Sequence, residues 1–164
     1  MILHLTVDGG KLDFQVEKML NAGYTARDQA QIEGHMEEMR KEGIAVPKSI
    51  PVFFPKITDR ITTADKIEVL ADKTTSGEVE FVLLFDQDKV YVGVGSDHTD
   101  RKLEQHNILA AKQMCANVIS AEVWRYEEVK DHWDDLILRS WVEKDGQRQL
   151  YQKAIPENAD FVNI

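Results

Sequence analysis

Three carboxylates stand beside a predicted β-hairpin at spacings that could form a metal site. Residues 79–85 and 90–95 are rich in β-branched and aromatic side chains. The polar sequence Asp-Gln-Asp separates them, which predicts two antiparallel strands joined by a short turn. Side chains alternate along a strand, so Glu78 and Glu80 share one face of the hairpin. Asp97 follows the second strand and is the third candidate ligand.

The register of this hairpin decides whether the three carboxylates meet. We predict that Phe85 pairs with Val90 across a four-residue loop, which places Asp97 opposite Glu78 at a Cβ separation of roughly 4.5–5.5 Å. Carboxylates this close would repel one another, whereas Mg²⁺, Mn²⁺ or Ca²⁺ takes oxygen ligands and leaves positions for water and substrate. A shift of one residue would turn Asp97 to the other face. Spacing alone therefore leaves two alternatives, a divalent-metal site and a solvated hairpin with surface acids.

A second candidate for chemistry lies on a helix predicted over residues 26–42, with Thr25 as its N-cap and Gly43 just past its end. His35 and Glu38 are three residues apart, so the carboxylate can contact and orient the imidazole. That arrangement is typical of a general base for water. An exposed histidine beside a glutamate is more commonly a solvated helix surface, and the helix pattern does not decide between the two.

Cations follow the third carboxylate. Thr99 or Asp100 could cap a helix that includes Leu103, and Arg101 and Lys112 are candidate cations downstream of the proposed metal site. They could bind a substrate carboxylate and stabilise an enolate or oxyanion. Surface and salt-bridge roles fit them as well.

The other elements surround this central hairpin. Residues 2–7 predict a first strand before an Asp-Gly-Gly turn, whereas residues 14–24 fit either a strand or a short helix. A buried strand is predicted at residues 52–54 and a second, short strand at residues 66–70. A hairpin is predicted at residues 136–143 and 147–153, with Asp-Gly at its turn. No element is predicted for residues 156–164, and core and dimer-interface roles both fit Trp133 and Trp141.

Composition limits the class of protein. The chain has 164 residues, which suits one domain, and its net charge of −9 argues against nucleic acid or an anionic membrane surface as main partner. Its one cysteine, Cys115, excludes an internal disulfide and fits a small buried side chain. We find no signal peptide and no apolar stretch of roughly 20 residues, so we expect a cytoplasmic protein.

Five segments, in order, resemble the fumarylacetoacetate hydrolase superfamily, and more closely an uncharacterised bacterial branch with the block GSDHTDR. The superfamily motifs are a lid helix N-Y-x-x-H-x-x-E-M, then P-V-x-F-x-K, E-x-E-L, N-D-x-S/T-x-R-D and A-K-S-F. The matching segments here are residues 32–39 (IEGHMEEM), 51–56 (PVFFPK), 78–81 (EVEF), 96–102 (SDHTDRK) and 111–114 (AKQM). Each motif alone is weak, but the five are similar to the family in order and separation.

The resemblance implies an α+β fold that is mainly β, a mixed β-roll or sandwich with peripheral helices, in a homodimer. Residues 1–60 would form the N-terminal strand and lid-helix region of a single domain, and residues 61–164 its metal-binding core. Site roles are also implied by the resemblance. Mg²⁺, with Mn²⁺ or Ca²⁺ as substitutes, would be bound by Glu78, Glu80 and Asp97; His35 with Glu38 would activate water; Lys112 would be catalytic; Arg101 and Lys56 would help to bind the substrate.

The expected function is metal-dependent hydrolysis of a carbon–carbon bond in a small 2-oxo or β-diketo acid. Two alternatives stay open, a 2-oxo acid decarboxylase or isomerase of the same superfamily and a catalytically silent scaffold. The departures from the family pattern motivate the second, because Ser96 replaces the usual Asn and no Gly-Pro-Trp follows Lys112. A Gly-Thr segment that completes the family's sheet after the last hairpin is also not found, so we expect a truncated or minimal member.

Overall fold

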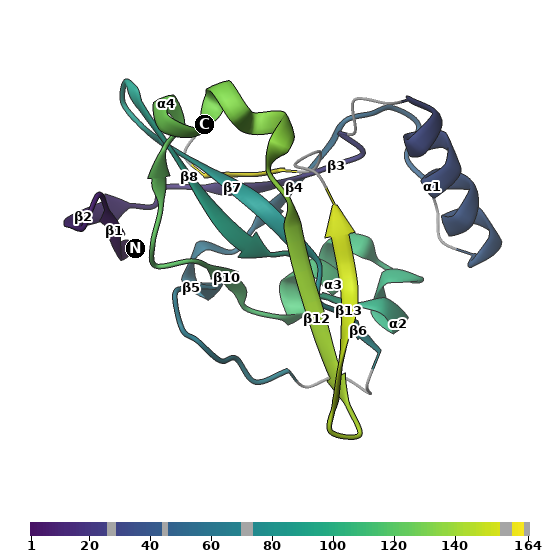
Figure 1. Ribbon diagram of the computed structural model, residues 1–164. Helices are drawn as coiled ribbons and strands as arrows, with labels where there is room; N and C mark the ends of the chain where they lie inside the picture. Colours follow the sequence, from purple (N-terminus) through teal and green to yellow (C-terminus); the bar gives the residue numbers. More distant parts are fainter. Residues whose placement is uncertain (26–28, 44–45, 70–73, 155–158, 163–164) are drawn as a thin grey trace.

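A sheet of eight strands forms the centre of the computed structural model, which describes residues 1–25, 29–43, 46–69, 74–154 and 159–162 (Figure 1). The architecture is mixed α and β and mainly strands, as expected, and the strands of the described part form small sheets without a closed barrel. The strands are β1 (Ile2–Val7), β2 (Gly10–Gln15), β3 (Met19–Gly23), β4 (Val52–Lys56), β5 (Ile61–Thr62), β6 (Thr75–Ser76), β7 (Val79–Asp86), β8 (Lys89–Ser96), β9 (Thr99–Asp100), β10 (Asn117–Ile119), β11 (Trp124–Arg125), β12 (Leu138–Lys144), β13 (Gln147–Ala154) and β14 (Ala159–Val162). The helices are α1 (Gln29–Lys41), α2 (Arg101–Glu104), α3 (Ile108–Met114) and α4 (Tyr126–Val129), with 3₁₀ turns at Thr58–Arg60 and Lys130–Asp135.

The central sheet has the strand order β4-β3-β14-β7-β8-β10-β5, and β11 also pairs with β8. Strands from residues 1–60 and from the rest of the chain thus share one sheet. β14 lies between β3 and β7, antiparallel to the first and parallel to the second. The expectation of no element after residue 156 was therefore wrong for Ala159–Val162. A four-residue strand is too short to show a period, and its place depends on two distant neighbours.

The hairpin of β7 and β8 confirms the predicted register. Phe85 pairs with Val90, and Glu80 pairs with Gly95. The turn is tighter than expected because Asp86 and Lys89 also pair, which leaves two residues at the tip. Glu78 and Asp97 lie just beyond the last pair of the ladder, where the Asp97 amide donates to the Glu78 carbonyl oxygen at 3.0 Å. The strands therefore stay paired as far as Glu78 and Asp97, and the alternation of side chains continues to these carboxylates.

The core lies between this hairpin and the N-terminal strands. β1 and β2 form the first predicted strand and its partner, joined by a turn with Asp8 and Gly9 at positive φ. Leu3, Leu5 and Phe14 from this pair pack in one buried cluster with residues of β7 and β8. Residues 14–24, where the sequence left strand and helix open, contain the end of β2 and all of β3.

The helices near the site follow their capping residues. α1 confirms the helix predicted around His35, and Gly43 at φ 77° ends it; the expected start at residues 26–28, and with it the role of Thr25, lies outside the described residues. The predicted helix after Asp97 is two short helices. Asp100 caps α2 by accepting from two backbone amides, and Asn107 caps α3.

Two strand predictions needed correction. Residues 66–69 form no strand, and Leu70 lies outside the described part. β4 forms, but Phe53 is 48% exposed and only Phe54 and Lys56 are buried. β4 is an edge strand with one face toward the interior, so the apolar run does not mean burial on both faces. The hairpin around Asp145-Gly146 is confirmed as β12 and β13.

No helix in the described part of the chain is both long and apolar enough to cross a membrane.

Candidate metal centre

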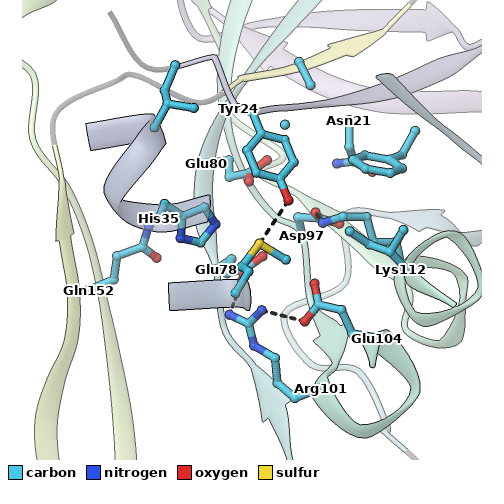
Figure 2. A pocket seen from close by; sticks show the side chains of 16 residues that line it. Asn21, Tyr24, His35, Glu78, Glu80, Asp97, Arg101, Glu104, Lys112 and Gln152 are labelled. Carbon is cyan, nitrogen blue, oxygen red and sulfur yellow. Dashed lines mark hydrogen bonds and ion pairs between the residues drawn. The ribbon is translucent and has the colours of Figure 1, made fainter. Parts of the chain in front are cut away.

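Glu78, Glu80 and Asp97 meet at the open end of the β7–β8 hairpin. Each offers a carboxylate oxygen, and these oxygens all lie within 4.8 Å of one another. Figure 2 shows the three side chains in one pocket, with Lys112 on one side and Arg101 below. The convergence predicted from alternation and register is therefore confirmed.

Two lysines hold Asp97 in place. Its side chain is 1% exposed, with Lys56 Nζ 3.3 Å from Oδ1 and Lys112 Nζ in contact with Oδ2. Lys56 also donates to the backbone carbonyl of Lys112. The buried ammonium of Lys56 therefore holds both Asp97 and Lys112 in position. Burial disfavours the charged form of Lys112, but the charges of Asp97 and Glu78 outweigh it and raise the Lys112 pKa. Lys112 is accordingly a permanent cation at neutral pH.

Arg101 links two of the acids. Its Nη2 lies 2.5 Å from Glu78 Oε1, and its Nη1 lies 2.7 Å from Oε2 of Glu104, whose side chain is 4% exposed. Burial raises the pKa of Glu78, and the charges of Lys112 and Arg101 offset this only in part. Burial also opposes the charge on Arg101, but the two glutamates outweigh it and raise its pKa.

The three carboxylates, Glu104 and the cations Arg101 and Lys112 line a pocket of about 320 Å³, to which the sheet, α1 and the α2–α3 segment all contribute. His35 extends from α1 into its lining, with its ring centroid 5.8 Å from that of Tyr24. Glu38 is exposed, is not among the lining residues and makes no hydrogen bond to His35 in the described structure. Lys56 lies behind Asp97 and does not line the pocket either.

Several pocket residues were missed by the sequence interpretation. Tyr24 donates from its hydroxyl to Met39 Sδ at 3.0 Å, and burial, together with the charge of Glu104, raises its pKa. Gln152 from β13 forms one wall and bonds both backbone groups of Val79. Glu104 could have been found, because Asp100 predicts a helix start that places Glu104 three residues after Arg101. Tyr24 and Gln152 carry no such local signal.

The donor set fits a hard divalent cation. All three groups are carboxylates, and ionised carboxylates keep lone pairs for a metal even where a lysine or arginine already donates to them. Nearby cations offset part of the negative charge, which keeps the cluster together before an ion binds. Oxygen donors of this kind suit Mg²⁺, Mn²⁺ and Ca²⁺ and do not select among them.

Comparison with known proteins identifies a family that matches most of the chain. The model of the family DUF2848, described as protein of unknown function, matches residues 22–159, a stretch that contains every predicted site residue. No curated protein and no solved structure matches the chain.

Proposed function

As the chain belongs to the DUF2848 family, we propose its function from the site itself: it is a divalent-metal-dependent hydrolase that cleaves a carbon–carbon bond in a small 2-oxo or β-diketo acid. The observation that carries the proposal is the convergence of three carboxylates within 4.8 Å beside two pocket-lining cations. A metal and cations together suit a substrate that carries both an oxo group and a carboxylate.

The resemblance to the fumarylacetoacetate hydrolase superfamily supports the same proposal. Its motifs come from five separate segments, and residues from all five lie at this pocket or directly behind it. They are His35, Lys56, the three carboxylates, Arg101 and Lys112. We propose that the sheet is a version of that superfamily's β-roll, with Mg²⁺ as the ion and Mn²⁺ or Ca²⁺ as substitutes.

Each side chain would have a distinct task. Glu78, Glu80 and Asp97 hold the ion, which when bound would polarise the substrate's oxo group. Arg101 is half-exposed at the pocket and pairs with the substrate carboxylate. Lys56 positions Asp97 and Lys112 from behind and does not touch the substrate.

The hydrolytic step needs a base and an electron acceptor. His35 takes a proton from water, whose oxygen attacks the second carbonyl carbon. The carbon–carbon bond then breaks, its electron pair passes to the neighbouring carbon as an enolate, and the proton returns there. Lys112 offsets the developing negative charge as a fixed cation. Glu38 does not touch the pocket, so any part it plays runs through His35.

The position of Glu38 favours a second candidate of the same kind. A decarboxylase or isomerase would use the same carboxylates and cations without an attacking water, so it does not need a His35–Glu38 pair. Glu38→Gln separates the two: activity should be abolished in a hydrolase that depends on this pair and spared in a decarboxylase. If Glu38→Gln hydrolyses the substrate as fast as the wild type, Glu38 has no role in activating water.

Calorimetric titration with Mg²⁺ and Mn²⁺ tests the site before any substrate is known. We expect binding by the wild type, loss in Glu80→Gln, and wild-type behaviour in Asp88→Asn, which removes a carboxylate from the far tip of the same hairpin. Binding would justify a screen of 2-oxo and β-diketo acids. A wild type that binds neither ion at millimolar concentration would refute the enzyme proposal and favour a catalytically silent scaffold.

A further inference from the structure

In the described part of the chain, the hairpin of β12 and β13 has a strand edge that pairs with no other strand. The two strands pair with each other and with no other strand in the described part of the chain. Figure 1 shows them running out from the sheet so that their turn projects beyond the rest of the molecule. A two-stranded hairpin alone in water is marginal, and an open edge of this length is normally blocked or paired.

Large apolar side chains gather on this hairpin. Trp141 is 48% exposed and Leu150, directly opposite it, is 53% exposed. Val142 and Tyr151 are exposed to a similar degree. Arg148 stacks 4.5 Å from the centroid of the Trp141 ring, so the indole is held in place and still half open. A cluster of this kind on a projecting element is characteristic of a surface that another protein covers.

The faces of β12 differ in burial. Leu138 and Ser140 are partly buried, and β12 also contacts β7. Arg139, Trp141 and Glu143 alternate with them and are exposed. They therefore share the outward face of the strand.

The charges on that face are arranged symmetrically. Arg139 and Glu143 stand two residues before and two residues after Trp141. If a second β12 pairs antiparallel with its Trp141 opposite this one, each Arg139 faces the Glu143 of the other copy on the same face. Two ion pairs then flank the tryptophan pair. Opposite charges at equal distances from a central residue make this face complementary to itself, and an interface across a two-fold axis needs a self-complementary surface.

We propose that the outer edge of β12 is the interface with a second copy of this chain, joined antiparallel across a two-fold axis at Trp141. The inference does not depend on the proposed enzymatic function. It concerns the same hairpin whose Gln152 walls the pocket, so the contact would also hold that wall in place.

Charge reversal tests the register directly. Arg139→Glu alone and Glu143→Arg alone each place like charges opposite one another at both ion pairs. In sedimentation-velocity runs we expect the wild type to form dimers at tens of micromolar, and each single variant to dimerise at least about tenfold more weakly. Mixing the two variants should restore a dimer, because only the mixed pair brings opposite charges together. The double variant Arg139→Glu/Glu143→Arg should dimerise by itself.

Controls separate this result from misfolding. Circular dichroism checks that each variant is folded, and Lys11→Glu changes a charge on an exposed hairpin strand elsewhere and should leave the dimer intact. A wild type that stays monomeric at about 200 micromolar overturns the proposal, since interfaces of ordinary size associate well below that concentration. A dimer that survives both single reversals, or folded variants that fail to recover on mixing, overturns it as well.

Discussion

The two long hairpins of this protein have nearly the same length and opposite surroundings. β7 and β8 lie inside the main sheet, where Val82 and Leu84 have no exposed surface. β12 and β13 stand outside it, and residues 141–151 are exposed throughout. A strand that is covered on its faces has one acceptable register, because a slip of one residue would bury the wrong side chains. The fixed register of the β7–β8 hairpin therefore keeps Glu78, Glu80 and Asp97 together at its open end.

The largest difference between the hairpins should appear at their charged residues. Asp97→Asn removes the buried carboxylate charge that both Lys56 and Lys112 contact, so we expect the protein to lose about 3–5 kcal/mol of unfolding free energy. Glu143→Gln, on the exposed hairpin, should cost less than about 0.5 kcal/mol in a dilute sample. Urea unfolding with a chelator present measures both. Equal losses would mean that Asp97 is not the partner that keeps the two lysines buried.

Leucine truncation extends the comparison to apolar contacts. Leu84→Ala in the core hairpin should cost about 2–5 kcal/mol, because it removes fully buried methyl groups and leaves a cavity. Leu150→Ala should cost less than about 1 kcal/mol in dilute solution, since half of its surface is already in water. If Leu150→Ala proved as damaging as Leu84→Ala at low protein concentration, β13 would have to be covered within a single chain.

The turns should respond with opposite signs. Gly146 has φ 73°, so Gly146→Ala should lower the unfolding free energy by about 1 kcal/mol. Gln87 has φ 54° with a side chain present, so Gln87→Gly relieves strain at the first turn position and should stabilise by up to about 1 kcal/mol. Thermal unfolding of the two variants gives the signs. A loss of stability in Gln87→Gly would show that the Gln87 side chain contributes more than its backbone strain costs.

The smallest expected effect is the loss of stability that comes from ionising the buried carboxylate of Glu78. Burial raises the pKa of Glu78 above its ordinary value of 4.5, so folding favours its protonated form. Its ionisation therefore lowers stability as the pH rises from that value through the raised pKa. Without metal, Glu78→Gln should have a slightly higher unfolding temperature than the wild type at neutral pH, and the gap should shrink toward pH 4.5. A gap that is constant between pH 4.5 and 8 would contradict this account.

Local sequence was sufficient to predict the structure where the pattern lies within one hairpin. The pairing of Phe85 with Val90 across the turn, together with alternation, predicted that Glu78, Glu80 and Asp97 meet, and Asp-Gly predicted the outer hairpin. Contacts between distant segments had no such pattern. Tyr24 and Gln152 enter the pocket from opposite ends of the chain, and β14 is placed by partners far away in sequence. The alternation of β4 was hidden by an apolar run, since Phe53 faces outward although its type favours burial.

The position of β14 has a consequence for how the chain folds. β3 and β7 are synthesised well before the strand that joins them, so their facing edges have no neighbour until residues 159–162 emerge. Contacts between segments so far apart in sequence form slowly. During that interval the growing chain carries two open strand edges next to the pocket, which are templates for aggregation. We therefore expect its yield of native protein to depend on chaperones that bind the nascent chain, and a chain cut after Lys153 to accumulate in the insoluble fraction.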